Sequence, residues 1–282
     1  MNARGGTIFR QLFDRSCCCF TYLIGDKYQK TALLIDPVLE QVDRDLKLVK
    51  ELGLETKSKN FRKELACGIQ QRFHNLTILR TNYLEYASAA FMCWIHEQAL
   101  LAKHCSLKYV LNTHVHADHI TGSGLIKDRL NTNGKLQVLS IVSESSGAEA
   151  DICVDDGEVI DCGLVKLNVT YTPGHTNGCM SLIDHYNKRV FTGDALFIRG
   201  CGRTDFQEGS PSKLYDSVHS RLFTLPDDYS VYPAHDYNGH TMSTIGEEKK
   251  FNPRMVTSKE EFIEIMENLN LDYPKMLGEL VD

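Results

Sequence analysis

The sequence lacks any apolar run that is long enough to cross a membrane. Its best candidate, Tyr86–Ile95, is too short and is followed by the polar residues His96 and Glu97, whereas a spanning helix needs about 20 predominantly apolar residues. It also lacks a basic run of the kind that suggests a nucleic-acid partner, and its formal net charge of -6 would oppose contact with phosphates. These absences predict no membrane segment and no nucleic-acid partner.

The residues before Thr7 lack the apolar core of a secretory signal peptide. The 10 cysteines are therefore expected to be reduced and mostly buried. The run Cys17–Cys19 is interpreted as small residues on a strand, because adjacent cysteines rarely chelate one metal well. Met1–Phe13 carries basic residues and no acid, as a mitochondrial presequence would, but the strand-like Thr7–Phe13 leaves too little chain for one.

What is present is the composition of a single α/β domain. A length of 282 residues, with 42% hydrophobic and 24% charged residues, suffices for one well-packed domain. Runs with strand and helix periodicity alternate along the chain. The predicted strands are Thr7–Phe13, Phe20–Gly25, Thr31–Ile35, Leu107–Leu111, Leu136–Val142, Val165–Thr172, Cys179–Ile183, Arg189–Thr192 and Ser230–Tyr232. The predicted helices are Val42–Leu52, Ile120–Leu130, Pro211–Phe223 and one that begins at Ser258.

Four of these strands end directly before residue types that bind metals. The strand ending near residue 112 precedes a cluster of His and Asp, and those ending near residues 172, 192 and 232 precede His175, Asp194 and His235. Loops at strand ends are where a rigid scaffold places chemistry. For each of these three residues taken alone, a purely structural role is as good an explanation as metal binding. Their shared position after a strand, however, predicts one convergent metal site.

The cluster itself has the spacing H-x-H-x-D-H, with His114, His116, Asp118 and His119 inside six residues. In a loop after a strand, such spacing turns several side chains toward one point. Neutral imidazoles and a carboxylate are the ligands of zinc or non-haem iron. Asp118 has two alternative roles, as an acid/base group or as a residue that orients a ligating histidine. The cluster predicts a metal site and leaves the metal and its stoichiometry open.

The order of motifs along the chain resembles a known superfamily. The cluster is followed by Thr172–Thr176 (T-P-G-H-T), Thr192–Asp194 (T-G-D) and Pro233–Asp236 (P-A-H-D). This series is similar to that of the metallo-β-lactamase superfamily. The resemblance implies an α/β fold, an αββα sandwich in a single domain, with the site at one edge of the two sheets.

Longer blocks carry a closer resemblance, to the persulfide dioxygenase family, which is related to the hydroxyacylglutathione hydrolases of glyoxalase II type. The blocks are Phe9–Phe13, Asn112–His114, Ile198–Gln207, Pro233–Tyr237 and Asn252–Arg254. The resemblance covers about residues 7–54 and 107–276, and its most specific part is the block from residue 199 to residue 207.

The family resemblance implies an iron-dependent sulfur dioxygenase with one Fe(II) per chain. Carried over by position, the metal ligands are His114, His175 and Asp194, and this set of two His and one carboxylate leaves open positions for substrate and O2. The implied reaction oxidises glutathione persulfide with O2 to sulfite and glutathione. Holding both reactants in one site makes their reaction effectively intramolecular.

The resemblance also implies roles for residues around the metal. The catalytic groups, which would support the ligands or face the substrate without binding a second metal, are His116, Asp118, His119 and His235. The residues that would contact the glutathione moiety are Arg203, Tyr237 and Arg254. An arginine fork suits the two carboxylates of glutathione. A structural salt bridge is the alternative role of Arg203.

Two other functions stay open at this point. A thioester hydrolase of glyoxalase II type prefers two metals with a bridging hydroxide, and all seven His and Asp positions for such a site are present. Ligand types alone therefore do not exclude it, whereas the block Ile198–Gln207 favours the dioxygenase. The third hypothesis is a non-enzymatic relative in which residues 55–106 cover the site and mediate protein contacts.

The chain departs from the family pattern between the predicted helix Val42–Leu52 and the strand that begins at Leu107. Within a domain over residues 7–282, residues 55–106 form an atypical insertion, with a basic start and a helical pattern over Tyr83–Lys103. This is far longer than the usual connection. It is either a lid or partner-binding helix, or a mispredicted segment that is foreign to the functional protein, and we favour the second interpretation.

Location and assembly are expected from the resemblance alone. It implies a mitochondrial enzyme. The cytoplasm is the alternative, because no clear transit peptide is recognised. For the assembly, the resemblance is compatible with a homodimer.

Overall fold

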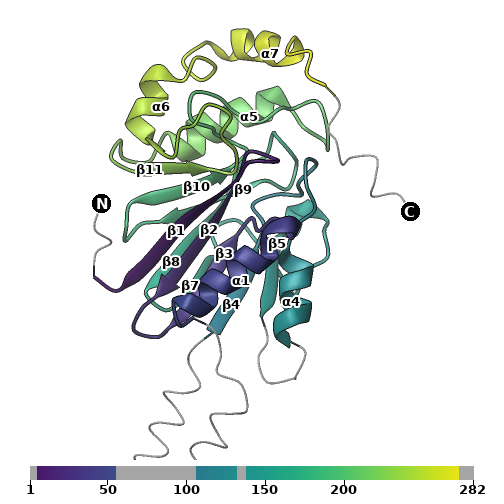
Figure 1. Cartoon of the computed structure of the whole chain (residues 1–282). Helices are drawn as coiled ribbons and strands as arrows, with labels where there is room; N and C mark the ends of the chain where they lie inside the picture. Colours follow the sequence, from purple (N-terminus) through teal and green to yellow (C-terminus); the bar gives the residue numbers. More distant parts are fainter. Residues whose placement is uncertain (1–4, 55–105, 132–137, 273–282) are drawn as a thin grey trace, which may run out of the picture.

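Two six-stranded sheets pack face to face in the computed structural model, which describes residues 5–54, 106–131 and 138–272 (Figure 1). The first sheet, in the order β1-β2-β3-β4-β5-β6, consists of β1 (Thr7–Asp14), β2 (Cys19–Asp26), β3 (Thr31–Ile35), β4 (Ser106–Leu111), β5 (Leu139–Ser143) and β6 (Ile152–Val154). The second, in the order β12-β11-β10-β9-β8-β7, consists of β7 (Val159–Cys162), β8 (Val165–Tyr171), β9 (Met180–Asp184), β10 (Arg189–Gly193), β11 (Ser230–Pro233) and β12 (Ser243–Thr244).

Helices cover the outer faces of both sheets (Figure 1). The helices outside the first sheet are α1 (Val42–Glu51) and α4 (Ser123–Asn131), and those outside the second are α5 (Pro211–Ser217), α6 (Ile245–Phe251) and α7 (Lys259–Glu267). Shorter turns are η1 (Leu39–Gln41), η2 (Glu144–Ser146) and the π-helical η3 (Val218–Leu222). The predicted αββα sandwich is confirmed. Within the described ranges, no helix is long and apolar enough to cross a membrane.

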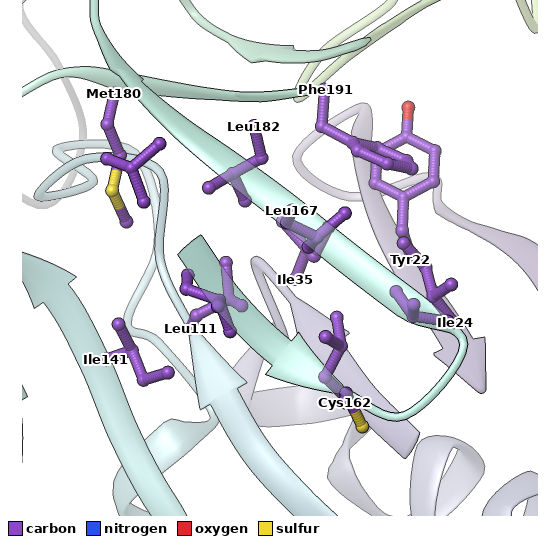
Figure 2. Packing of buried hydrophobic residues seen from close by; sticks show 14 of the residues in the cluster. Tyr22, Ile24, Ile35, Leu111, Ile141, Cys162, Leu167, Met180, Leu182 and Phe191 are labelled. Atoms are coloured by element: carbon purple, nitrogen blue, oxygen red, sulfur yellow. The ribbon is translucent and has the colours of Figure 1, made fainter. Parts of the chain in front are cut away.

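Three apolar clusters hold the layers together, and their side chains alternate along the strands. In β3, Ile35 belongs to the cluster between the sheets, which also contains Leu111 and Leu182 (Figure 2), whereas its neighbour Leu34 faces α1 and α4. A third cluster, including Phe262 of α7, lies between the second sheet and its helices. A strand that is buried on both faces becomes a continuous apolar run, which is the pattern that the sequence shows at β3.

Strand directions bring the loops of the site to one edge. Strands β8, β10 and β11 point the same way, because β10 pairs parallel with β11 and antiparallel with β9, which is itself antiparallel to β8. In the first sheet β3, β4 and β5 are parallel. The two sheets are joined at this edge by a hydrogen bond of 2.9 Å from the Met180 amide to the Thr113 carbonyl.

Most of the predicted helices and strands are present in the structure, with bounds within a few residues of those expected. The helix predicted from Ile120 begins only at Ser123, because the preceding residues pair with the chain after β3: Thr121 forms a β-bridge with Val38, and the Ile120 carbonyl accepts from the Leu39 amide. The helix predicted over residues 211–223 is divided into α5 and η3. Strands β6, β7 and β12 and helix α6 are too short to give a clear periodic signal and were not predicted.

The predicted insertion lies outside the described residues, apart from Ser106, which begins β4. The helix expected over Tyr83–Lys103 also lies outside them.

The inter-sheet cluster makes a direct prediction for stability. Replacing Leu182, which is fully buried, by Ala removes apolar contacts and leaves a cavity, so we expect the free energy of unfolding to fall by about 2–5 kcal/mol. Urea unfolding followed by circular dichroism measures it. The control Val159→Ala alters a side chain that is 50% exposed and should change stability by less than about 0.5 kcal/mol. Equal effects of the two substitutions would contradict this layer assignment.

Candidate metal centre

The predicted site residues reach one point from both sheets. His114 follows β4, His175 follows β8, Asp194 follows β10 and His235 follows β11. The Ala234 amide donates to the Gly193 carbonyl over 3.0 Å, so the last two loops are bound to each other directly beside their functional side chains. The loops that carry Asp194 and His235 are therefore held together at this edge.

Three of these side chains form a compact set of potential metal ligands. One donor atom from each of His114, His175 and Asp194 lies within 4.8 Å of the others, and all three residues are buried. The Oδ2 atom of Asp194 is 3.8 Å from Nε2 of His114 and 3.4 Å from Nε2 of His175. The set predicted from the family resemblance is thus brought together in the fold.

Hydrogen bonds hold both imidazoles so that Nε2 faces the carboxylate. Nδ1 of His114 lies 3.0 Å from the Thr113 hydroxyl, which itself donates to Asp36. Nδ1 of His175 donates to the Arg203 carbonyl over 2.7 Å. A hydrogen bond at one ring nitrogen selects the tautomer with a lone pair at the other. Both Nε2 atoms are therefore free to bind a metal.

The charges of the set agree with this role. Burial, together with the neighbouring His116, lowers the pKa of His114 well below its usual value, so its ring is neutral. Burial opposes ionisation of Asp194, but His235 and His114 outweigh it and hold the pKa of this carboxyl below its usual value. Neutral imidazole and ionised carboxylate are the forms that bind metals.

The other predicted catalytic groups surround this set. His235 Nδ1 donates to Oδ1 of Asp194 over 2.6 Å, and its Nε2 lies 2.9 Å from Oδ2 of Asp118. Burial alone would lower the pKa of His235, but these two carboxylates raise it well above its usual value. His119 Nδ1 also contacts Asp118, at 3.3 Å. Asp118 thus contacts two imidazoles. This arrangement fits both roles predicted for it, as an acid/base group and as a residue that orients a histidine.

Within the histidine cluster, two buried nitrogen atoms have no hydrogen-bond partner among the described residues: Nδ1 of His116 and Nε2 of His119. Leaving such atoms without any partner costs free energy. They therefore mark positions where water, substrate or a metal would contact the site.

Asp36 is a site residue that sequence reasoning missed. Its carboxylate accepts from the amide of Thr113 (2.7 Å) and from the Thr113 hydroxyl (2.9 Å), and it lies 3.3 Å from Nε2 of His116. It anchors the start of the His cluster and indirectly orients His114. The signal that could have identified it is the same as for the ligands, an acidic residue directly after a buried strand.

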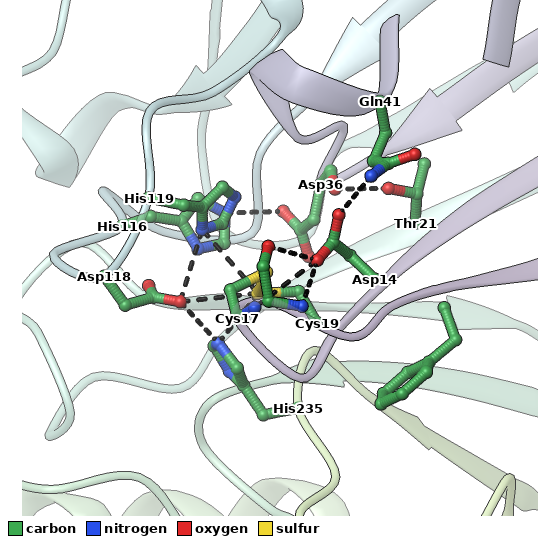
Figure 3. Close-up of a disulfide and its surroundings, with 12 residues drawn as sticks. Asp14, Cys17, Cys19, Thr21, Asp36, Gln41, His116, Asp118, His119 and His235 are labelled. Atoms are coloured by element: carbon green, nitrogen blue, oxygen red, sulfur yellow. Dashed lines mark hydrogen bonds and ion pairs between the residues drawn. A yellow bond between two sulfur atoms is a disulfide. The ribbon is translucent and has the colours of Figure 1, made fainter. Parts of the chain in front are cut away.

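The cysteine run differs from its prediction. Cys17 and Cys19 are joined by a disulfide (Figure 3), and only Cys19 belongs to a strand. The reversal of the chain between β1 and β2, with Cys18 at a positive φ of 57°, places the two Cα atoms 5.3 Å apart. The prediction of reduced thiols is therefore wrong for this pair, and the other cysteines of the described ranges are free.

A cavity of about 750 Å³ opens beside the candidate metal ligands and is lined by His175, Asp194 and the three predicted substrate-binding residues. Arg203 forms two hydrogen bonds to Asp205, of 2.7 and 2.8 Å, so its alternative structural salt bridge is present. Arg254 donates to the Cys201 carbonyl, and no salt bridge among the described residues involves it. The Tyr237 ring, which is mostly exposed, stacks on His235 at a centroid distance of 5.9 Å.

Close packing at Gly202 supports the candidate ligands Asp194 and His175, and its effect can be tested. A Cβ here would lie 2.6 Å from the Asp194 carbonyl oxygen and 2.9 Å from Nδ1 of His175. Gly202→Ala should therefore displace both ligands and weaken metal binding about 10- to 100-fold, as changes beside metal ligands do. A Co(II) titration followed by visible absorption measures it. The control Gly200→Ala, whose nearest neighbour would be 3.9 Å away, should bind normally, and equal affinities in both variants would contradict the assignment.

The chain is similar to several known proteins. The Metallo-beta-lactamase superfamily matches residues 84–235. The human protein Persulfide dioxygenase ETHE1, mitochondrial, is 41% identical over 281 residues, which cover 98% of this chain and 89% of the relative. The crystal structure of ETHE1 from Myxococcus xanthus is 42% identical with a TM-score of 0.73, and the match covers 96% of this chain and 94% of that one. Hydroxyacylglutathione hydrolase from Brucella anthropi is 36% identical over 141 residues, 50% of this chain and 52% of the relative.

The extent of each likeness separates the two families. The likeness to the persulfide dioxygenases spans nearly the whole chain, whereas that to the hydrolase spans half of it. The chain therefore belongs to the metallo-β-lactamase superfamily and, within it, to the persulfide dioxygenase family.

Proposed function

We propose that the chain is an iron-dependent persulfide dioxygenase that oxidises glutathione persulfide with O2 to sulfite and glutathione, with one Fe(II) per chain. The observation that carries the proposal is the compact set of His114, His175 and Asp194, whose donor atoms lie within 4.8 Å of one another, with His175 and Asp194 lining a cavity. Two His and one carboxylate, with the remaining positions open, are the ligands of non-haem Fe(II) oxygenases. The family membership of the chain supports the same reaction.

The donor set fits one iron. Each histidine has its Nδ1 engaged and its Nε2 directed at Oδ2 of Asp194, so the three ligands converge without rearrangement. When bound, Fe(II) supplies the redox chemistry with O2 beside the persulfide sulfur. The burial of all three residues limits the contact of the ligands with bulk water.

A second metal is disfavoured by the hydrogen bonds that already engage His235 and Asp118. Both ring nitrogens of His235 are engaged by carboxylates, at 2.6 Å from Asp194 and 2.9 Å from Asp118. His235 and Asp118 already satisfy each other, so we assign to this pair the task of orienting Asp194 and holding a proton.

The Asp118–His235 pair is suited to hold a proton beside the substrate. Asp118 lines the cavity and its side chain is 36% exposed, whereas His235 is buried behind it. A proton held between Nε2 of His235 and Oδ2 of Asp118 faces the space where the oxidised sulfur must meet water and leave as sulfite. His116 and His119, each with one unpartnered nitrogen, would contact water or substrate there.

The glutathione moiety would lie along the cavity between the metal ligands and the three predicted contact residues. We assign Arg254 as the anchor of one carboxylate, because it lines the cavity and forms no salt bridge within the described part of the chain. Arg203 is held by Asp205 and would engage substrate as part of that pair. Tyr237 presents an exposed ring to the peptide.

A thioester hydrolase with two metals is the second candidate. The feature that favours it is that Asp118, His119 and His235 lie together beside the first set, as a dinuclear site would require. The partial likeness to hydroxyacylglutathione hydrolases is its other support.

The two candidates differ in metal content and in reaction. The full chain, loaded anaerobically with excess Fe(II) and desalted, should hold about one iron per chain and consume O2 with glutathione persulfide. His175→Ala should lose the iron, because it removes a ligand. His235→Ala should keep most of it at saturating iron, with affinity weakened about 10- to 100-fold. Elemental analysis and an oxygen electrode measure these.

A matched control is His185→Ala, since His185 is bonded to Tyr229 on a turn away from the site. It should retain iron and activity. Two metals per chain with hydrolysis of S-lactoylglutathione would establish the hydrolase in place of the dioxygenase, and iron loss in His235→Ala but not in His175→Ala would refute the ligand set.

The carboxylate anchor makes a kinetic prediction. Arg254→Gln should raise KM for glutathione persulfide about 10- to 100-fold, the loss expected for one charge-assisted hydrogen bond, with a smaller change in kcat. Initial rates of O2 uptake measure both constants. Arg221→Gln removes an arginine whose partner is Asp156 outside the cavity and should leave KM unchanged. An unchanged KM in Arg254→Gln would show that the carboxylates bind elsewhere.

For location we propose the mitochondrion, which the names of the human, Bos taurus and Mus musculus relatives support. The cytoplasm stays the alternative. The homodimer remains an expectation from the family.

A further inference from the structure

Two cysteines that the proposed mechanism does not use lie at the edge of the metal centre. Cys17 and Cys19 flank the turn between β1 and β2 and are joined by a disulfide, with Cα atoms 5.3 Å apart. The bond closes a loop of only a few residues. Because the stabilisation from a disulfide grows with the length of the loop it closes, this one contributes little to the stability of the fold. Its position therefore suggests a chemical role.

The sulfur atoms reach into the polar groups of the site (Figure 3). Sγ of Cys19 is 3.3 Å from Oδ2 of Asp118, 3.3 Å from Nε2 of His235 and 3.8 Å from Nδ1 of His119. His235 in turn donates to the metal ligand Asp194 over 2.6 Å. One imidazole ring thus separates the disulfide from the metal ligands.

The two cysteines differ in their access to the cavity. Cys17 is half-buried and lines the same cavity as His175 and Asp194. Cys19 is only 2% exposed and lies behind it. In the reduced pair, a substrate sulfur in the cavity would therefore meet Cys17 first, and Cys19 would be the adjacent thiol that completes a disulfide.

We propose that the reduced Cys17–Cys19 pair is a second, oxygen-independent acceptor for the outer sulfur of a persulfide substrate; this rests on the proposed function for the identity of that substrate. The Cys17 thiolate attacks the outer sulfur, the sulfur–sulfur bond of the persulfide breaks, and the glutathione thiolate leaves. Cys17 then carries the persulfide. The Cys19 thiolate attacks the inner sulfur of this group, the Cys17–Cys19 disulfide forms, and hydrosulfide leaves.

The electrons balance within these steps. One glutathione persulfide and two cysteine thiols become one glutathione, one hydrogen sulfide and one disulfide, so the persulfide is reduced by two electrons and the cysteine pair is oxidised by two. Two glutathione molecules return the pair to its dithiol form by thiol–disulfide exchange and leave as glutathione disulfide. The disulfide in the structure is the oxidised end of this cycle.

The test uses the full chain without iron and without O2. The chain is reduced, desalted anaerobically into a chelator and mixed with glutathione persulfide. The chelator is needed because the donors of Cys17, Cys19, Asp118 and His119 also lie within 4.8 Å of one another and could bind a metal when reduced. We expect a burst of about one hydrosulfide per chain, together with a new Cys17–Cys19 disulfide in peptide mapping by mass spectrometry.

Single variants assign the two steps. Cys17→Ser should abolish the burst. Cys19→Ser should release no hydrosulfide and should retain one extra sulfur atom on Cys17 by intact mass. Two controls should keep the burst: Cys18→Ser, at the free thiol between the pair, and Cys153→Ser, at an exposed thiol on β6. A burst of wild-type size in Cys17→Ser or Cys19→Ser, or a wild-type reaction without the disulfide, would overturn the proposal.

The result is separable from the proposed function. Oxygen uptake by the iron-loaded chain is measured in parallel. Normal oxygen uptake without the anaerobic burst would refute the dithiol and leave the dioxygenase intact. A burst without oxygen uptake would refute the dioxygenase and support the dithiol.

Discussion

The carboxylate of Asp194 joins the two halves of the site. Its Oδ1 accepts from His235 over 2.6 Å, while its Oδ2 faces Nε2 of His114 and of His175. One oxygen is thereby held in place by a hydrogen bond, and the other is left for a metal. Burying this charge would cost several kcal/mol if it were unpaired, so its surrounding imidazoles are a condition for the fold at this edge as well as for binding.

The sandwich provides these partners because its sheets end at a common edge. His114 comes from the first sheet and Asp194 from the second, and the Met180–Thr113 hydrogen bond keeps the two loops in register. Gly202 permits the next loop to pack against Asp194 with a hydrogen bond of 2.8 Å between backbone atoms. The positions of the site residues thus depend on backbone hydrogen bonds between loops. The side chains that line the cavity determine which substrate fits.

The sequence was most informative where a signal is local. Buried strands followed by His or Asp predicted one convergent metal site, because a strand and the loop after it are adjacent in the chain. The αββα sandwich was implied by the resemblance of the motif order to a known superfamily. Asp36 was missed because its role depends on Thr113, 77 residues away, and only strand pairing brings them together. The Cys17–Cys19 bond was missed because it depends on the turn geometry at Cys18. Short elements such as α6 gave too few residues for a periodic signal.

The central claim is a single metal held by His114, His175 and Asp194. Crystals of the iron-loaded chain, with diffraction recorded at the iron absorption edge, test it most directly. The account predicts one anomalous peak, within bonding distance of both Nε2 atoms and of Oδ2 of Asp194, with Asp118 and His235 still bonded to each other. A second peak between Asp118, His119 and His235, or a single peak displaced to that position, would contradict it.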